Sequence, residues 1–97
     1  MIRHVVAFRW DEQMTEEMER QFTAELTALA PKLPGLRSYQ AGPDLKLVDG
    51  NFDFAVVAEF DDTESYVGYR DHPEHQAIIA RYSKPHATSR AAVQFEY

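Results

Sequence analysis

The sequence predicts an α+β fold with one four-stranded antiparallel sheet and the element order β-α-β-β-α-β. Three observations lead to this prediction. Four short segments are rich in β-branched and aromatic residues or alternate apolar and polar side chains, as strands do. Between the first two lies a longer segment with apolar side chains at three- and four-residue steps, as in an amphipathic helix. The chain has 97 residues and no cysteine, so we expect one domain, residues 1–97, with a thin core and no disulfide.

The first half of the chain contains two predicted strands with a helix between them. Ile2 to Trp10 is the first strand, and its period of two places on one face His4, Val6, Phe8 and Trp10. Thr15 can cap the helix, whose apolar stripe consists of Met18, Phe22, Leu26, Leu29 and Leu33. Prolines and a glycine end this helix, and Leu36 to Ala41 follows as a short second strand.

The second half contains the clearest strand, Phe52 to Phe60, and a last strand from Ala87 to Tyr97. The third strand presents on one face Phe52, Phe54, Val56, Ala58 and Phe60. Together the four strands and two helical segments give the ferredoxin-like order, in which the helices cover one face of the sheet.

A proline breaks the second helical segment. Asp62 or the threonine after it can cap its first part. His72 precedes Pro73, and a residue before proline avoids the α-helical region. Proline is well placed at the first position of a new helix, so we expect one to run to about Tyr82 and to end before Pro85.

The sheet face away from the helices is also apolar, through Val5, Ala7, Ala55 and Val57. A bare apolar face is unfavourable in water and marks an interface. The chain is too short to cover this face itself. We therefore expect a homodimer in which two sheets pack face to face.

Several classes of function are disfavoured. The net charge of −6 and the lack of a Lys/Arg cluster argue against a nucleic-acid partner. No apolar run is long enough to cross a membrane, and the first ten residues do not resemble a signal peptide, so we expect a cytoplasmic protein. The glycine-rich loops that bind phosphates or dinucleotides are missing, and we expect no cofactor.

The segment YRDHPEHQ, residues 69–76, is the strongest candidate for chemistry. His75 lies in the first turn of the predicted helix, where the helix dipole favours the neutral imidazole that a general base needs. Tyr69 can direct its hydroxyl into the same hollow and orient a substrate oxygen. A purely structural interpretation also stands, in which His72 caps the helix and Tyr69 is a core aromatic residue.

Two further histidines call for interpretation. His4 lies on the face that the helices cover, where a hydrogen-bonded structural histidine and a pocket residue are both open interpretations. His86 lies in a predicted loop, and we expect it to be exposed. A metal site is not expected, because the spacing of His72 and His75 differs from the HExxH pattern and no second carboxylate is well placed.

The segments RHVVAFRW, PGLRSYQAG, FDFAVVAEFDD and YRDHPEHQAII together resemble the stress-responsive dimeric α+β barrel family over essentially the whole chain. The resemblance implies a ferredoxin-like protomer whose sheet pairs with that of a partner to close a barrel. Cyclase-type members close a linear polyketide by aldol condensation. Their catalytic residues correspond here to His75 and Tyr69, and their early-strand histidine corresponds to His4, at the pocket.

The predicted pocket is apolar and aromatic, and we expect its lining to include His4, Val6, Phe8, Phe54, Val56 and His72. Three functions remain open at this point. The first is a cofactor-free cyclase- or lyase-like enzyme that uses His75 and Tyr69 as an acid/base pair. The second is a non-catalytic dimer that binds a small hydrophobic molecule, and the third is a stress-associated structural dimer.

Overall fold

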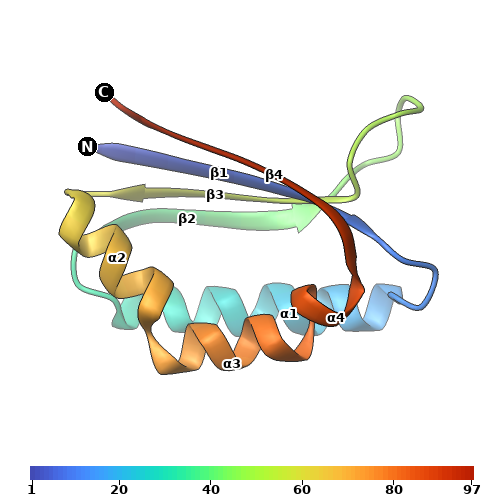
Figure 1. Ribbon diagram of the computed structural model, residues 1–97, viewed down its shortest axis with the longest axis horizontal. Helices are drawn as coiled ribbons and strands as arrows, with labels where there is room; N and C mark the ends of the chain where they lie inside the picture. Colours follow the sequence, from blue (N-terminus) through green and yellow to red (C-terminus); the bar gives the residue numbers. More distant parts are fainter.

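The computed structural model describes all residues, 1–97, and has the predicted order of elements (Figure 1). The elements are β1 (Ile2–Trp10), α1 (Glu16–Leu29), the 3-10 turn η1 (Ala30–Lys32), β2 (Leu36–Pro43), β3 (Phe54–Phe60), α2 (Thr63–Asp71), α3 (Pro73–Arg81), α4 (Ser83–His86) and β4 (Ala87–Glu96). The second helical segment is divided at Pro73, as the sequence predicts. Pro85, expected only to end a helix, lies inside the short α4.

The sheet has four antiparallel strands in the order β2-β3-β1-β4. Figure 1 shows all helices on one side of this sheet, while the other side is uncovered. The predicted ferredoxin-like α+β protomer is therefore confirmed. None of the helices is both long and apolar enough to span a bilayer.

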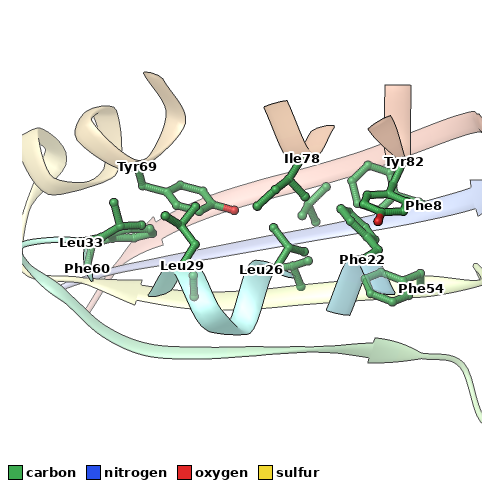
Figure 2. Close-up of a cluster of buried hydrophobic side chains, with 13 residues drawn as sticks. Phe8, Phe22, Leu26, Leu29, Leu33, Phe54, Phe60, Tyr69, Ile78 and Tyr82 are labelled. Carbon is green, nitrogen blue, oxygen red and sulfur yellow. The ribbon is translucent and has the colours of Figure 1, made fainter. Parts of the chain in front are cut away.

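The core lies between the sheet and the helices and follows the predicted periodicities (Figure 2). Four residues of the predicted helix stripe are buried, namely Phe22, Leu26, Leu29 and Leu33. The helix itself ends at Leu29, earlier than its stripe, because Pro31 lacks the N–H group that would continue it. Leu33 still reaches the core through the short turn that follows.

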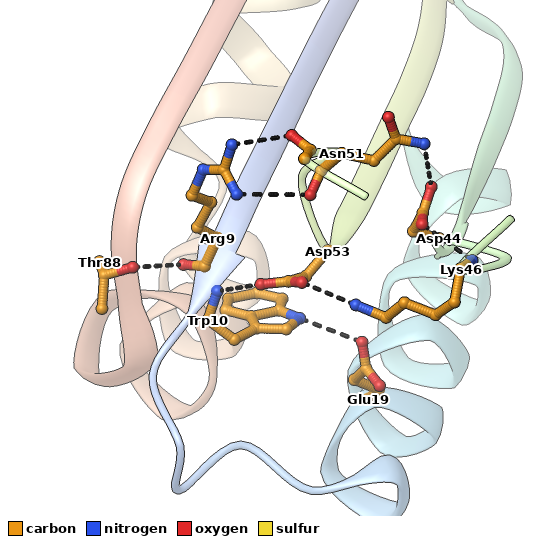
Figure 3. A network of polar contacts seen from close by, with 9 residues as sticks. Arg9, Trp10, Glu19, Asp44, Lys46, Asn51, Asp53 and Thr88 are labelled. Atoms are coloured by element: carbon orange, nitrogen blue, oxygen red, sulfur yellow. Dashed lines mark hydrogen bonds and ion pairs between the residues drawn. The ribbon is translucent and has the colours of Figure 1, made fainter. Parts of the chain in front are cut away.

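The prediction that β3 begins at Phe52 is wrong, because Asp53 and its neighbours hold a loop here (Figure 3). The Asp53 carboxylate accepts hydrogen bonds from the Trp10 backbone N–H and from Lys46 Nζ, both at 2.8 Å. The ring of Phe52 packs against the Arg9 guanidinium, 4.2 Å from its centroid, instead of entering the core. The favourable contact between a cation and an aromatic face thus takes Phe52 out of the predicted stripe.

His86 also differs from the prediction. Its side chain is only 15% exposed, and its Nδ1 lies 3.1 Å from a carboxylate oxygen of Asp11. The backbone N–H of Asp11 donates to the His86 carbonyl at 2.8 Å, so the two residues are joined twice. The sequence places them 75 positions apart, and local patterns therefore give no sign of this pair.

Gly35 is the glycine that the fold requires most strictly. Its φ of +79° is left-handed, and a Cβ there would lie 2.6 Å from the Cβ of Ser65. Ser65 cannot easily withdraw, because its backbone N–H and its hydroxyl both donate to the Asp62 side chain, the cap of α2. We expect Gly35→Ala to lower the free energy of unfolding by about 2 to 4 kcal/mol, through backbone strain and overpacking together.

Urea denaturation followed by circular dichroism measures this loss. Gly50→Ala is the matched control, since Gly50 also has a left-handed φ, +90°, but has open space where the Cβ would stand. The Gly50→Ala variant shows the effect of backbone strain alone, and its free energy of unfolding should fall by about 1 kcal/mol. Equal losses in the two variants would show that the contact with Ser65 contributes nothing.

Candidate functional site

A cavity of about 420 Å³ lies between the helices and the sheet. Strands β1 and β3 and helix α1 supply most of its apolar wall, and α2 and α3 supply most of its polar groups. The predicted site residues that line it are His4, Val6, Phe8, Val56, Tyr69 and His75. The fold thus brings together an aromatic and aliphatic wall, two imidazoles and a phenol.

His75 is buried in the first turn of α3, with 7% of its surface exposed. Its Nδ1 lies 3.2 Å from the backbone carbonyl oxygen of Arg70, which can only accept a hydrogen bond. The neutral ring therefore carries its proton on Nδ1 and leaves Nε2 as an acceptor. Burial lowers the pKa of His75, although the bond to the Arg70 carbonyl acts in the opposite direction. The ring is thus neutral at neutral pH, with an unprotonated Nε2.

Tyr69 lies against His75, with ring centroids 4.0 Å apart. Figure 2 shows its ring extending from α2 into the space between the helices and the sheet. Its hydroxyl is 3.0 Å from the hydroxyl of Tyr39 on β2. Burial raises the pKa of Tyr69 to about 12 and also raises that of Tyr39. Both phenols therefore keep their protons at neutral pH and can donate hydrogen bonds.

His4 enters the same cavity from β1 and is almost fully buried, with 3% of its surface exposed. Its Nδ1 accepts a hydrogen bond from the Gln94 side-chain amide at 3.0 Å, so Nε2 carries the proton. Burial, with the nearby charge of Arg90, lowers the pKa of His4 to about 4. The two imidazoles are thus held in opposite tautomers. The Nε2 of His4 carries a proton and can donate a hydrogen bond, whereas the Nε2 of His75 has no proton and can accept one.

Two of the predicted pocket residues lie elsewhere. Phe54 is buried in the core, between Trp10 and Phe22, and does not line the cavity. His72 also lies outside the cavity and caps α3, where its Nδ1 accepts a hydrogen bond from the Glu74 backbone N–H at 3.1 Å. The predicted cap at His72 is therefore present, and His72 does not line this cavity, although the sequence had suggested that it would.

Sequence reasoning missed several polar residues of this region. Tyr66 lines the cavity one helical turn before Tyr69, and its ring centroid is 5.1 Å from that of His4. The three-residue spacing of the two tyrosines could have predicted this position, because residues three apart lie on the same face of a helix. The roles of Tyr39 and Gln94 depend on strand register, which pairs Gln94 with His4 across β1 and β4.

The depressed pKa of His4 predicts a loss of stability in acid. A histidine in the unfolded chain has a pKa near 6.5, whereas native His4 stays neutral down to about pH 4. Between these values only the unfolded state takes up the proton, so the free energy of unfolding falls as the pH falls through this window. The expected loss is about 3 kcal/mol, measured by urea denaturation at a series of pH values.

His4→Phe keeps an aromatic ring of similar shape without the titrating group and should remove much of this acid sensitivity. The buried His75 contributes in the same direction, so part of the pH dependence should remain. An unchanged pH dependence in His4→Phe would contradict the assignment to His4.

The structure brings no three His, Asp or Glu side chains together in a group that could hold a metal ion. The cavity offers proton donors and acceptors next to an apolar wall, and this arrangement suits acid/base chemistry or binding of a small apolar molecule.

The fold and the cavity define a ferredoxin-like α+β protein with a pocket between its sheet and its helices. The chain belongs to the stress responsive A/B barrel domain family, whose sequence profile matches residues 2–97. A protein of Streptomyces coelicolor is 28% identical over 82 residues, which are 82% of this chain and 84% of that one.

Solved structures agree with this assignment. A dimeric ferredoxin-like protein of Thermobifida fusca is 41% identical, with a TM-score of 0.90 over 99% of this chain and 90% of that one. The hydroxynitrile lyase of Passiflora edulis has a TM-score of 0.79 over 97% of this chain and 90% of that one. At 19% identity, the likeness to the lyase concerns the fold alone.

Proposed function

We propose that the cavity binds a small hydrophobic or aromatic molecule and that His75 and Tyr69 act on it as a cofactor-independent acid/base pair. The observation that carries this proposal is the contact between a buried His75, with its Nε2 unprotonated, and a protonated Tyr69 within one cavity. A neutral imidazole beside a phenol supplies both a base and an acid at neutral pH. The reaction class is the making or breaking of a carbon–carbon bond next to a carbonyl group.

The chemistry needs only proton transfers. In the cleavage direction, His75 Nε2 removes the proton of a substrate hydroxyl, the oxygen forms a carbonyl, and the adjacent carbon–carbon bond breaks. The electron pair leaves with the departing carbon, which takes a proton from the resulting imidazolium. In the reverse direction, His75 deprotonates the carbon acid, the carbanion adds to the carbonyl, and the new alkoxide is protonated. An aldol cyclisation follows this second direction.

Tyr69 orients the substrate oxygen in this proposal. If Tyr39 donates to the Tyr69 oxygen across their 3.0 Å contact, the Tyr69 proton is free to bind the substrate. The raised pKa of Tyr69 keeps that proton in place. His4 offers a second donor through Nε2–H, since Gln94 occupies its Nδ1. The developing negative charge on the oxygen thus meets fixed hydrogen-bond donors.

One solved structure and the sequence resemblance support a reaction of this class. The hydroxynitrile lyase of Passiflora edulis shares the fold, and the family that the sequence resembles has cyclase-type members, for which the resemblance implies an aldol condensation. Both reactions join or separate a carbonyl carbon and a carbon nucleophile, with a proton transferred at the oxygen.

Non-catalytic binding is the second candidate function. The wall formed by Val6, Phe8 and Val56 is apolar and can hold a flat hydrophobic ligand without any reaction. This candidate predicts binding of aromatic probes with no turnover in the native protein. A stress-associated structural dimer without a ligand predicts neither.

The proposed assembly is a homodimer formed through the uncovered sheet face. Strand β4 and the residue that follows it add to this face three large exposed side chains, Val93, Phe95 and Tyr97, which are 58%, 44% and 55% exposed. Val93 lies opposite Val5, which pairs in turn with Val57, and Phe95 lies opposite Arg3. The Thermobifida fusca relative is a dimer, and a face of this composition is stabilised by burial against a second copy. We expect an interface of about 1,600 Å² in total or more.

Two probe reactions test the catalytic proposal. An aromatic cyanohydrin and an aromatic β-hydroxyketone both release an aromatic aldehyde when the hydroxyl loses its proton, and absorbance follows the aldehyde. We expect release above the buffer rate by the native protein and slower release by Tyr69→Phe, with KM less affected than kcat. Probe binding without release would favour the non-catalytic function, and the absence of both would contradict the proposal.

A further inference from the structure

The cavity differs in charge from the rest of the protein. The chain has 16 acidic and 10 basic residues, yet no carboxylate lines the cavity. Three cationic side chains do, and these are Arg70, Lys84 and Arg90. The charged side chains that line the cavity are thus all basic, although the protein as a whole has a net charge of −6.

Two of these cations are distinguished by the lack of any partner. Seven of the ten Lys and Arg side chains form ion pairs with carboxylates, among them Arg70 with Asp71 at 2.9 Å. Arg9 is bound to loop carbonyl oxygens and to the Phe52 ring. Only Lys84 and Arg90 make neither an ion pair nor a side-chain hydrogen bond, and both line the same cavity.

The position of Arg90 ties it to the proposed catalytic groups. Arg90 lies on β4 opposite Phe8 of β1, on the sheet face that the helices cover. Its charge adds to the effect of burial in lowering the pKa of His4, and it slightly opposes the effect of burial in raising the pKa of Tyr69. Lys84 reaches the cavity from α4, which immediately precedes β4. Both residues are exposed to solvent, so they stand at the mouth of the cavity and not at its base.

We infer that the cavity selects an apolar molecule with a carboxylate, held at the mouth by Lys84 and Arg90 while its apolar part lies against Val6, Phe8 and Val56. This inference rests on the proposed function and names the substrate class of that site. Two unpaired cations favour an anion, and the apolar wall favours a hydrophobic body. A neutral hydrocarbon satisfies only the second feature, and a small inorganic anion only the first.

Matched probes separate these cases. Naphthoate and naphthamide have the same ring system, and only the first is an anion, while acetate is the anion without the rings. Calorimetry gives the dissociation constants, and the imidazole resonances of His4 and His75 report whether a probe occupies the cavity. We expect naphthoate to bind about tenfold more tightly than naphthamide at low salt and this advantage to shrink at high salt.

Variants at the mouth of the cavity then show whether Lys84 and Arg90 cause the tighter binding of naphthoate. Lys84→Gln and Arg90→Gln should each reduce the advantage of naphthoate by roughly threefold, and the double variant should abolish it. The control is the double variant Arg20→Gln and Lys32→Gln, which removes the same charge from exposed positions outside the cavity and should keep the advantage. All four side chains are exposed, so we expect these variants to fold normally.

Each other outcome has a distinct meaning. Naphthamide that binds in the cavity as tightly as naphthoate would overturn the inference and leave the proposed function standing. The same holds if the advantage of naphthoate survives in the Lys84 and Arg90 double variant. Acetate that binds as well as naphthoate would show a simple anion site and would overturn the assigned substrate class. Failure of both aromatic probes to perturb His4 or His75 would overturn the inference together with ligand binding in the cavity.

Discussion

The His75→Ala variant should lose about 10²- to 10⁴-fold in kcat for the probe reactions, because this is the usual contribution of a positioned proton transfer. The loss should appear in kcat more than in KM, since the apolar wall that holds the probe is untouched. In the native protein kcat should fall in acid as His75 becomes protonated, at a pH below the ordinary pKa of histidine. Steady-state kinetics across a pH series measures both effects.

His72→Asn is the matched control for this variant. It removes a histidine three residues away that caps α3 from outside the cavity, and asparagine can keep the cap. Its turnover and stability should stay close to those of the native protein. If His72→Asn lost activity while His75→Ala kept it, the roles of the two histidines would be reversed.

Val57→Asp should convert the dimer into monomers at micromolar concentration. Val57 pairs with Val5 in the middle of the uncovered sheet face, so the substitution buries an unpaired carboxylate in each protomer of the proposed interface. Two such charges related by symmetry should weaken the association by roughly a thousandfold or more. Sedimentation velocity measures the oligomeric state, and circular dichroism shows whether the protomer remains folded.

Val48→Asp makes the same chemical change in the loop between β2 and β3, where Val48 is 62% exposed. This control should leave the dimer intact. A native protein that sediments as a monomer at micromolar concentration would contradict the proposed assembly directly. A Val57→Asp variant that remains dimeric would place the interface on another surface.

The protomer fold could be predicted from local sequence patterns because each element reports its own environment. Alternation in Ile2–Trp10 identified the buried face of β1, and the spacing of Phe22, Leu26 and Leu29 identified the buried face of α1. The effect of Pro73 on its neighbour placed the break between α2 and α3. In each case the residues that determine the structure lie within a few positions of the element they affect, so a single sequence is sufficient to predict that element.

The sequence also predicted that the side chains of His75 and Tyr69 face the same hollow, because the two residues flank one helix break. It did not indicate the tautomer of His75, which depends on the Arg70 carbonyl at the end of α2. Nor did it distinguish Phe54, which packs in the core, from Val56, which lines the cavity on the same strand face. Period two identifies a face of a strand, and only the packing of helices on that face divides it into core and cavity.

The sequence by itself thus determined the order of elements, the two-sided strands and the segment that carries the candidate site. Only the tertiary structure decided that His4 meets Gln94, that His86 meets Asp11, and that Lys84 and Arg90 remain unpaired beside the cavity. Hydrophobic periodicity is a short-range property of the chain, and it fixes which face of an element is buried. Partnerships between charges and hydrogen-bonding groups depend on distances across the fold, which follow from strand register and from the way the helices pack on the sheet.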